Sequence, residues 1–307
     1  MDTNIQLAII SDANYLDFAA ITLTSILWHH RGGGLTINMI HPSEMQTEKL
    51  EKIRELQKIA PFDFNAIPVN SERFERDWGV SKPTWWRCEM PSLCPQAKKM
   101  LYLDCDMIVL DDIEKLWSEP LGEAVIGAVG DRLGLKVAET LKMPAERYFN
   151  AGMLLMDLEA LRKENAEDMM RETLKKRHDD IFYADQDLLN ICFWERTRML
   201  DQRWNIINSV YRNLPVTGMY TVEDVKDALS SPGIVHFTGH HKPWLFWKNV
   251  HHPYAERFWH YTLLSNCSSK LKFKIFLKQH LMNIWVAPKK SLPWDLSILK
   301  RFKDEDK

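Results

Sequence analysis

The sequence predicts an α/β fold with a mostly parallel central sheet. Short apolar segments alternate with amphipathic segments through the N-terminal half, and this strand-helix-strand alternation favours parallel strands. A content of 45% hydrophobic residues over 307 residues is ample for a packed core. Ligands of open α/β sheets bind at the carboxyl ends of the strands, so polar residues that follow apolar strands form the candidate site.

The first elements follow from hydrophobic periodicity and from the residues that interrupt it. An apolar strand at 5–10 ends in the polar turn Ser11-Asp12-Ala13-Asn14-Tyr15, and an amphipathic helix follows at 16–29. After the glycines at 32–34 we expect a strand at 35–40, a helix at 44–59 and a strand at 62–67. Neither Gly-x-Gly-x-x-Gly nor a P-loop follows the first strand, which argues against dinucleotide- and nucleoside-triphosphate-binding folds.

The apolar run at 100–110 carries two carboxylates, Asp104 and Asp106. Burial of an unpaired carboxylate is costly, so we expect a cation beside them. Side chains two apart on a strand point the same way, so the pair can converge on one ion if the extended conformation persists. Oxygen ligands suit Mg²⁺ or Mn²⁺. The alternative is a strand-end turn with solvated carboxylates, and Asp111 and Asp112 already resemble a turn before a short helix at 113–117.

Three further polar groups border apolar segments. Asn150, Ala151 and the glycine after them precede the apolar residues 153–156, while Asp185, Gln186 and Asp187 open a helix that reaches about residue 194. His236 begins a segment rich in donors and aromatic residues. Structural alternatives exist for each group, namely a plain turn, a helix-capping aspartate and a core histidine.

Charge and cysteine content limit the function classes. The formal net charge is −2, so we expect no nucleic-acid partner. Five cysteines without a Cys-x-x-Cys pair or zinc-type spacing indicate a reducing compartment. The first basic residue is Arg31, and no apolar run approaches the ~18 residues of a membrane span. These features predict a cytoplasmic, unprocessed protein.

In combination, seven segments resemble glycosyltransferase family 8, the retaining enzymes that include bacterial lipopolysaccharide galactosyl- and glucosyltransferases and glycogenin. The segments follow the family's order over residues 5 to about 250, and they are 11–15, 86–87, 101–109, 149–155, 185–190, 202–205 and 236–244. The resemblance implies a GT-A type nucleotide-diphospho-sugar transferase fold. Two positions depart from the family's pattern, because Cys105 stands inside the metal motif and Trp85-Trp86 precedes Arg87. If the strand alternation holds, Cys105 faces away from the metal.

The resemblance also implies the roles of individual residues. Asp104, Asp106 and His236 would bind Mn²⁺, with Mg²⁺ as the alternative, and the ion would bridge the phosphates of UDP-galactose or UDP-glucose. Apart from the resemblance, His240 of the pair at 240–241 is a candidate acceptor contact, and the alternative is a surface histidine without a role. The residues implied for catalysis are Asp185, Gln186 and Asp187, and those implied for donor binding are Ile10, Asp12, Asn14, Tyr15, Arg87, Asp104, Cys105, Asp106, Asn150, Ala151, Gly239 and Lys242.

Retention of configuration normally calls for a carboxylate nucleophile. The residue nearest that position in the family resembles Gln186, an amide. Our hypothesis is therefore a front-face displacement, in which departing UDP helps to deprotonate the acceptor and Gln186 shields an oxocarbenium-like centre. We expect transfer of galactose or glucose to a lipid-linked glycan, a lipopolysaccharide or lipooligosaccharide core. The alternatives are a self-glucosylating glycogenin-like transferase, a non-catalytic nucleotide-sugar-binding relative and a nucleotidyltransferase.

The C-terminal stretch is basic and aromatic. Nine Lys and Arg residues between 270 and 303 are opposed only by Asp295. We expect a catalytic domain at 1–264 and a helical tail at 265–307, whose apolar face at 271–286 and lysines bind the inner-leaflet surface of the membrane. The enzyme would then be peripheral on the cytoplasmic face. The alternative is a helix that packs on the catalytic domain with solvated lysines.

Overall fold

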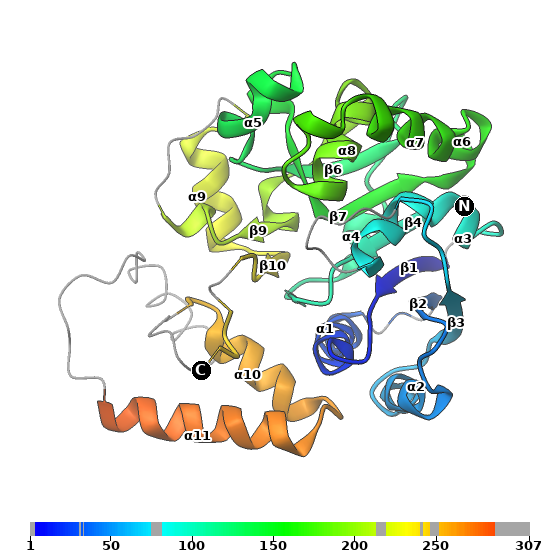
Figure 1. The fold of residues 1–307 in the computed structure, drawn as a ribbon. Coiled ribbons are helices and arrows are strands. Elements are labelled where there is room, and N and C mark those ends of the chain that lie inside the picture. Colours follow the sequence, from blue (N-terminus) through cyan, green and yellow to red (C-terminus); the bar gives the residue numbers. More distant parts are fainter. Residues whose placement is uncertain are drawn as a thin grey trace.

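The computed structural model of the chain describes residues 4–30, 32, 34–74, 82–212, 219–239, 242–245 and 252–285. Within them lies a seven-stranded sheet with the order β3-β2-β1-β4-β7-β6-β8 (Figure 1). All neighbours pair in parallel except β7, which is antiparallel to both β4 and β6. The predicted α/β fold with a mostly parallel sheet is confirmed. The strands are β1 Ile5–Ile10, β2 Leu35–Pro42, β3 Asp63–Val69, β4 Lys99–Leu103, β6 Ile126–Gly130, β7 Phe149–Asp157 and β8 Thr197–Met199.

A second, three-stranded sheet was not expected from the sequence. Its central strand β10 (Ile234–His236) is antiparallel to β5 (Met107–Val109) and parallel to β9 (Ile206–Ile207). Strands of two or three residues carry too little periodicity to be recognised in a sequence. The small sheet is important for the site because it brings His236 next to the end of β4.

Helices cover both faces of the large sheet. In Figure 1, α6, α7 and α8 lie on one side of it, and α1 and α2 lie on the other. The α-helices are α1 Leu16–His29, α2 Thr47–Arg54, α3 Met90–Leu93, α4 Ile113–Trp117, α5 Gly134–Leu141, α6 Leu158–Lys163, α7 Ala166–Lys176, α8 Ala184–Phe193, α9 Val222–Ser230, α10 Ala255–Leu264 and α11 Ser269–Trp285. The 3-10 helices are η1 Glu55–Lys58, η2 Lys82–Glu89, η3 Ala145–Arg147, η4 His178–Asp180, η5 Trp194–Arg196, η6 Gln202–Trp204 and η7 Val210–Arg212.

The core is divided by the sheet, as the pleat of a strand requires. On β1, Leu7 and Ile9 belong to the hydrophobic cluster shared with α1 and α2. Ala8 and Ile10 belong to the cluster shared with α8. The central strands are therefore apolar on both faces, which explains why their sequences read as continuous apolar runs.

Three predicted boundaries are corrected. The helix expected at 44–59 begins at Thr47 and continues as a 3-10 turn from Glu55. The strand expected at 62–67 extends to Val69. The run at 100–110 is not one strand, because β4 ends at Leu103 and β5 begins only at Met107. The chain turns at 104–106 to leave the large sheet and pair with β10 in the small one.

The start of the predicted C-terminal tail packs on the rest of the chain. The Ser268 hydroxyl donates to Asp17 Oδ2 at 2.5 Å, and Ile275 of α11 is buried in the cluster that includes α10. Figure 1 shows α11 at the periphery of the molecule, beneath α10. No helix among the described residues has the length and apolarity needed to cross a bilayer. The division at residue 264 stays a prediction, and residues 286–307 lie outside the described part.

Candidate functional site

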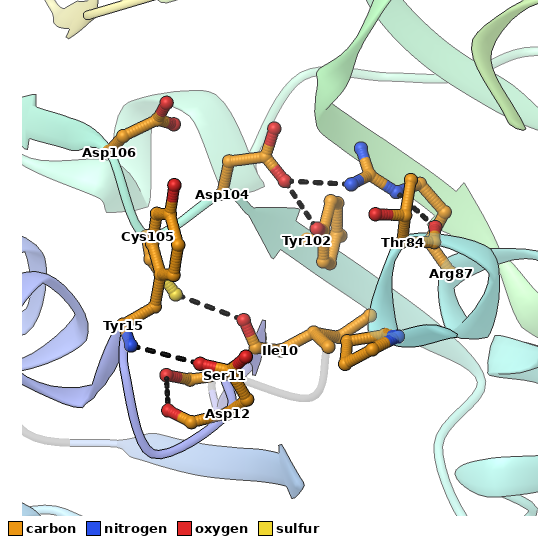
Figure 2. Close-up of a pocket in the computed structure, with 11 residues that line it drawn as sticks. Ile10, Ser11, Asp12, Tyr15, Thr84, Arg87, Tyr102, Asp104, Cys105 and Asp106 are labelled. Carbon is orange, nitrogen blue, oxygen red and sulfur yellow. Dashed lines mark hydrogen bonds and ion pairs between the residues drawn. The ribbon is translucent and has the colours of Figure 1, made fainter. Parts of the chain in front are cut away.

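The candidate site lies at the carboxyl ends of β1 and β4, where a pocket of ≈ 220 Å³ opens. This is the edge at which open α/β sheets bind ligands. Figure 2 shows Asp104 and Asp106 on the turn after β4, with Arg87 and Tyr102 bonded to Asp104. The lining residues are Ile10, Ser11, Asp12, Tyr15, Pro83, Thr84, Arg87, Tyr102, Asp104, Cys105 and Asp106.

Asp104, Asp106 and His236 form a cluster in which one ligand atom from each lies within 4.8 Å of the others. His236 Nε2 stands 3.1 Å from Asp106 Oδ1 and 3.7 Å from Asp104 Oδ2. Lys242 binds the second oxygen of Asp106. Burial raises the pKa of Asp106, but the opposing effect of His236 and Lys242 is larger, so the pKa lies well below its ordinary value. The cluster therefore keeps this carboxylate ionised and ready for a cation.

The two carboxylates converge because of the turn at 104–106, not because of strand alternation. The Asp104 amide donates to Gly152 O at 2.8 Å. The Thr22 hydroxyl of α1 lies within hydrogen-bond distance of Cys105 O at 2.7 Å and of Met107 O at 2.8 Å. The Cys105 thiol donates to Ile10 O at 2.9 Å, so it is directed toward β1. Backbone and hydroxyl contacts thus hold the turn that presents both aspartates.

Gly152 on β7 leaves space for the side chains of His236 and Asp104 because it has no Cβ. A Cβ at this position would stand 2.3 Å from His236 Cε1 and 2.7 Å from Asp104 Oδ2. Real Cβ atoms essentially never make contacts under 3.0 Å. The glycine of the Asn150-Ala151-Gly152 segment is therefore required by close approach, and the plain-turn alternative does not apply because the segment is part of strand β7.

Arg87 connects the cluster to helix α8. Its Nη2 is 3.0 Å from Asp104 Oδ1, and its Nε is 3.0 Å from Asp185 Oδ2. Nη1 donates to Ala151 O at 2.8 Å, and the guanidinium lies over the Tyr102 ring. Burial raises the pKa of Asp185 to about 6, and repulsion from the Asp104 carboxylate adds to this rise, whereas Arg87 opposes it. Asp185 is thus a carboxylate with a proton affinity in the near-neutral range.

Gln186 is held by four hydrogen bonds. Its Oε1 accepts from Asn150 Nδ2 and from Ala151 N, both at 3.1 Å. Its Nε2 donates to Tyr148 Oη at 3.0 Å and to Asp131 Oδ2 at 3.3 Å. Both amide lone pairs and both amide hydrogens are used, so the orientation of this side chain is well defined.

A protein-family model matches the part of the chain that contains this site. The model of glycosyl transferase family 8 matches residues 6–248, which include both aspartates, Arg87, Asp185 and His236. The chain belongs to glycosyl transferase family 8.

Family 8 relatives are similar over most of the chain. The chain is 29% identical to general stress protein A of Bacillus subtilis (strain 168), over 66% of this chain and 72% of that protein. It is 25% identical to lipopolysaccharide 1,2-glucosyltransferase of Escherichia coli (strain K12), over 77% and 71%. Of the longer glycosyltransferases GlyA and GlyB of Streptococcus pneumoniae serotype 4 it spans only 34% and 43%.

The fold is that of a solved glycosyltransferase. The crystal structure of galactosyltransferase LgtC, in complex with donor and acceptor sugar analogues, superposes with a TM-score of 0.76. The match has 22% sequence identity and covers 88% of this chain and 100% of that one. The expected GT-A type fold is confirmed by this likeness.

Asp187, which was expected in the site of this family 8 chain, does not line the pocket. Asp187 is fully buried, and its carboxylate accepts from Tyr148 Oη at 2.5 Å and from the amides of Phe182 and Tyr183. These bonds stabilise the turn in which Ala184 has a φ of 48°. Asp187 therefore holds the turn before α8, whose N-cap residue Tyr183 has no side-chain cap bond.

The end of β1 supplies the residues expected to bind the nucleotide. Asp12 Oδ1 accepts from the amides of Asn14 and Tyr15 at 2.8 and 3.0 Å, which holds the turn that precedes α1. Tyr15 lines the pocket, whereas Asn14 is exposed and is not part of the lining. Gly239 has a φ of 64°, in the left-handed region that glycine tolerates best. His240 lies outside the described residues.

Sequence reasoning missed three residues of the site. Tyr102 donates to Asp104, Asp131 accepts from Asn150 and Gln186, and Tyr148 joins Gln186 to Asp187. Asp131 directly follows β6, so its place after an apolar strand was an available signal. Tyr102 lies in an apolar run, and Tyr148 stands next to the Asn150-Ala151-Gly152 segment, but nothing in their local sequence separates either of them from a core tyrosine.

Proposed function

We propose that this family 8 protein transfers a hexose, galactose or glucose, from a UDP-sugar to a glycan acceptor with Mn²⁺ as cofactor. The observation that supports this proposal is the cluster of Asp104, Asp106 and His236 at the sheet edge, flanked by the cations Arg87 and Lys242. A site that combines three metal ligands with two fixed cations suits a diphosphate. The transferase class rests on the family, while donor, metal and acceptor are proposals.

The donor set fits the proposed metal. Two carboxylate oxygens and one imidazole nitrogen suit Mn²⁺, and Mg²⁺ is the alternative because it also prefers oxygen ligands. The side chains of Asp104 and Asp106 are 24% and 15% exposed, which leaves access for an ion and for phosphate oxygens. When bound, the ion supplies Lewis-acid stabilisation of the diphosphate. Lys242 would then add a second positive charge, and Gly239 would let the backbone approach closely.

The nucleotide would lie along the end of β1. Tyr15 is half-exposed at the pocket and would pack on the uracil ring. Asp12 keeps one carboxylate oxygen for a ribose hydroxyl, since only Oδ1 accepts from the amides of Asn14 and Tyr15. The remaining proposed donor contacts come from Ile10, Asn14 and Cys105.

The transferred sugar would occupy the space bordered by Arg87, Asn150, Ala151, Asp185 and Gln186. In the reaction, the bond between the anomeric carbon and the UDP oxygen breaks, and a bond to the acceptor oxygen forms. The acceptor proton passes to the departing diphosphate. Because Gln186 Oε1 already accepts two hydrogen bonds, it is a poor nucleophile, which supports the front-face displacement. A glycosyl adduct trapped on Gln186 or Asp187 and found by mass spectrometry would overturn this mechanism.

In this proposal Asp187 does not contact the sugar but acts through the residues that it holds in place. Its carboxylate holds Tyr148 and the turn before α8, and α8 carries Asp185 and Gln186. We therefore propose Asp187 as a positioning residue for the two side chains that would face the sugar.

The acceptor proposal rests on a relative and on α11. The Escherichia coli relative is named for lipopolysaccharide. On α11, Phe273 and Phe276 are 60% and 48% exposed, beside the exposed Lys270 and Lys274, while Ile275 packs inward. Exposed phenylalanines next to lysines suit an anionic leaflet. We propose that the protein works on the cytoplasmic face of the membrane, on a lipid-linked glycan.

The test is UDP release by the purified chain with Mn²⁺, using UDP-galactose and UDP-glucose with and without truncated lipopolysaccharide. Asp106→Asn should abolish acceptor-stimulated release. Asp111→Asn is the matched control, because Asp111 bonds Lys115 and Arg203 outside the cluster. Absence of release with any UDP-hexose, together with absence of Mn²⁺-dependent UDP binding, defeats the proposal. A gain of hexose mass on the protein itself would favour the glycogenin-like alternative, and UDP-sugar binding without turnover would favour a non-catalytic relative.

A further inference from the structure

We propose that Asn205 is a positioning residue that sets the tautomer of His236 and connects the metal ligands to Asn150. This inference rests on the proposed function, because it takes His236 as a metal ligand and Asn150 as a sugar contact. It concerns a residue that matched the family segment at 202–205 but to which the sequence assigned no role.

Asn205 is brought to His236 by the small sheet. It precedes β9, which pairs in parallel with β10, and Ile207 is the partner of His236. The Asn205 side chain is fully buried. Its Oδ1 lies 3.1 Å from His236 Nδ1, and its Nδ2 lies 2.9 Å from Asn150 Oδ1. The amide thus bridges the metal cluster and strand β7.

The direction of these bonds follows from one backbone group. The Gly152 amide can only donate, and it donates to Asn150 Oδ1 at 3.0 Å. Asn150 Oδ1 is therefore the oxygen end of that side chain, and its Nδ2 donates to Asp131 Oδ2 and Gln186 Oε1. An oxygen at the Asn150 end requires the NH₂ group of Asn205 to face it. The carbonyl oxygen of Asn205 then faces His236 Nδ1.

The tautomer of His236 is the consequence. Because Asn205 Oδ1 only accepts, the hydrogen of neutral His236 stands on Nδ1 and the lone pair stands on Nε2. Nε2 is the atom 3.1 Å from Asp106 Oδ1, on the side of the proposed ion. Such partners orient metal-bound histidines and raise their basicity. The same amide keeps Asn150 turned toward Asp131 and Gln186, so the metal ligands and the sugar-facing residues share one oriented network.

Two variants separate the two ends of Asn205. Asn205→Leu removes both hydrogen bonds, and we expect the Mn²⁺ affinity to fall by about 10- to 100-fold. Asn205→Asp keeps an acceptor for His236 Nδ1 but sets an oxygen against Asn150 Oδ1. We therefore expect Asn205→Asp to bind Mn²⁺ within about threefold of the wild type and to raise the KM for the UDP-sugar by about tenfold or more.

Free Mn²⁺ is measured by electron paramagnetic resonance during titration of the full chain, with and without UDP, and thermal unfolding is recorded for each variant. Asn38→Leu is the matched control, because Asn38 is a buried amide on β2 that bonds Gln6 and Asn65 far from the site. It should leave Mn²⁺ affinity unchanged.

Equal Mn²⁺ affinity in Asn205→Leu and the wild type overturns the inference. Equal loss of affinity in Asn205→Asp and Asn205→Leu overturns the deduced direction of the bonds. If Asn205→Leu does not fold, Asn205→Asp decides. Wild-type Mn²⁺ affinity together with a raised KM for the UDP-sugar supports the inference, and any other combination of Mn²⁺ affinity and KM refutes it. Failure of the wild type itself to bind Mn²⁺ defeats the proposed function instead, and the control titration distinguishes the two failures.

Discussion

Gly152→Ala is the sharpest perturbation that the site offers. The added methyl group would stand 2.3 Å from His236 Cε1 and 2.7 Å from Asp104 Oδ2. Carbon atoms in contact need about 3.5 Å, so the imidazole or β7 has to retreat by about 1.2 Å. Metal ligands tolerate only about 0.2 Å. The displacement is several times that tolerance, and it separates two of the three ligands at once.

We therefore expect Gly152→Ala to lower Mn²⁺ affinity and kcat/KM by about 10²-fold or more, while secondary structure is retained. Isothermal titration with Mn²⁺ in the presence of UDP measures the first quantity, and UDP release measures the second. The matched control is Gly127→Ala on β6, whose added Cβ would meet the ends of Leu121 and Leu200 at 3.0 and 3.2 Å. Mn²⁺ affinity in Gly152→Ala within twofold of the wild type would refute the close-approach reasoning.

Four other changes have defined outcomes. Burial raises the pKa of Asp185 from 3.8 to about 6, so the folded state holds this proton more tightly, and its contribution to the free energy of unfolding falls as pH rises through that interval. In urea unfolding of metal-free protein, the free energy of unfolding of the wild type relative to Asp185→Asn should fall between pH 3.8 and about 6 and be constant at higher pH. A difference that does not change with pH contradicts this. Asp187→Asn should lose about 2 kcal/mol of stability, because one acceptor oxygen becomes a donor against an amide or a hydroxyl, and unchanged urea unfolding would disprove it. Thr22→Val, which removes the hydroxyl on the turn at 104–106, should weaken Mn²⁺ binding by about tenfold, and wild-type titration curves would speak against it. Phe273→Ser combined with Phe276→Ser should lower sedimentation with anionic vesicles at unchanged UDP release, and equal sedimentation would leave α11 without a membrane role.

The site divides into residues that local sequence could predict and residues that it could not. Asp12 and Asp104 follow apolar strands, so their place at the carboxyl edge of a parallel sheet was predictable. The family resemblance then added His236 from more than a hundred residues away. Asp187 could not be separated from its neighbours Asp185 and Gln186, since the direction of each side chain depends on how α8 packs against β7.

The sequence by itself determined the α/β class, the mostly parallel sheet and the family, because periodicity and ordered motifs are local properties of the chain. Only the tertiary structure decided how Asp104 and Asp106 converge, since their turn is set by β5 pairing with β10 and by Thr22 bonding across from α1. It also decided that Gly152 must lack a side chain and that Asn205 lies between His236 and Asn150. These features depend on contacts between residues far apart in the chain, and no local pattern encodes them.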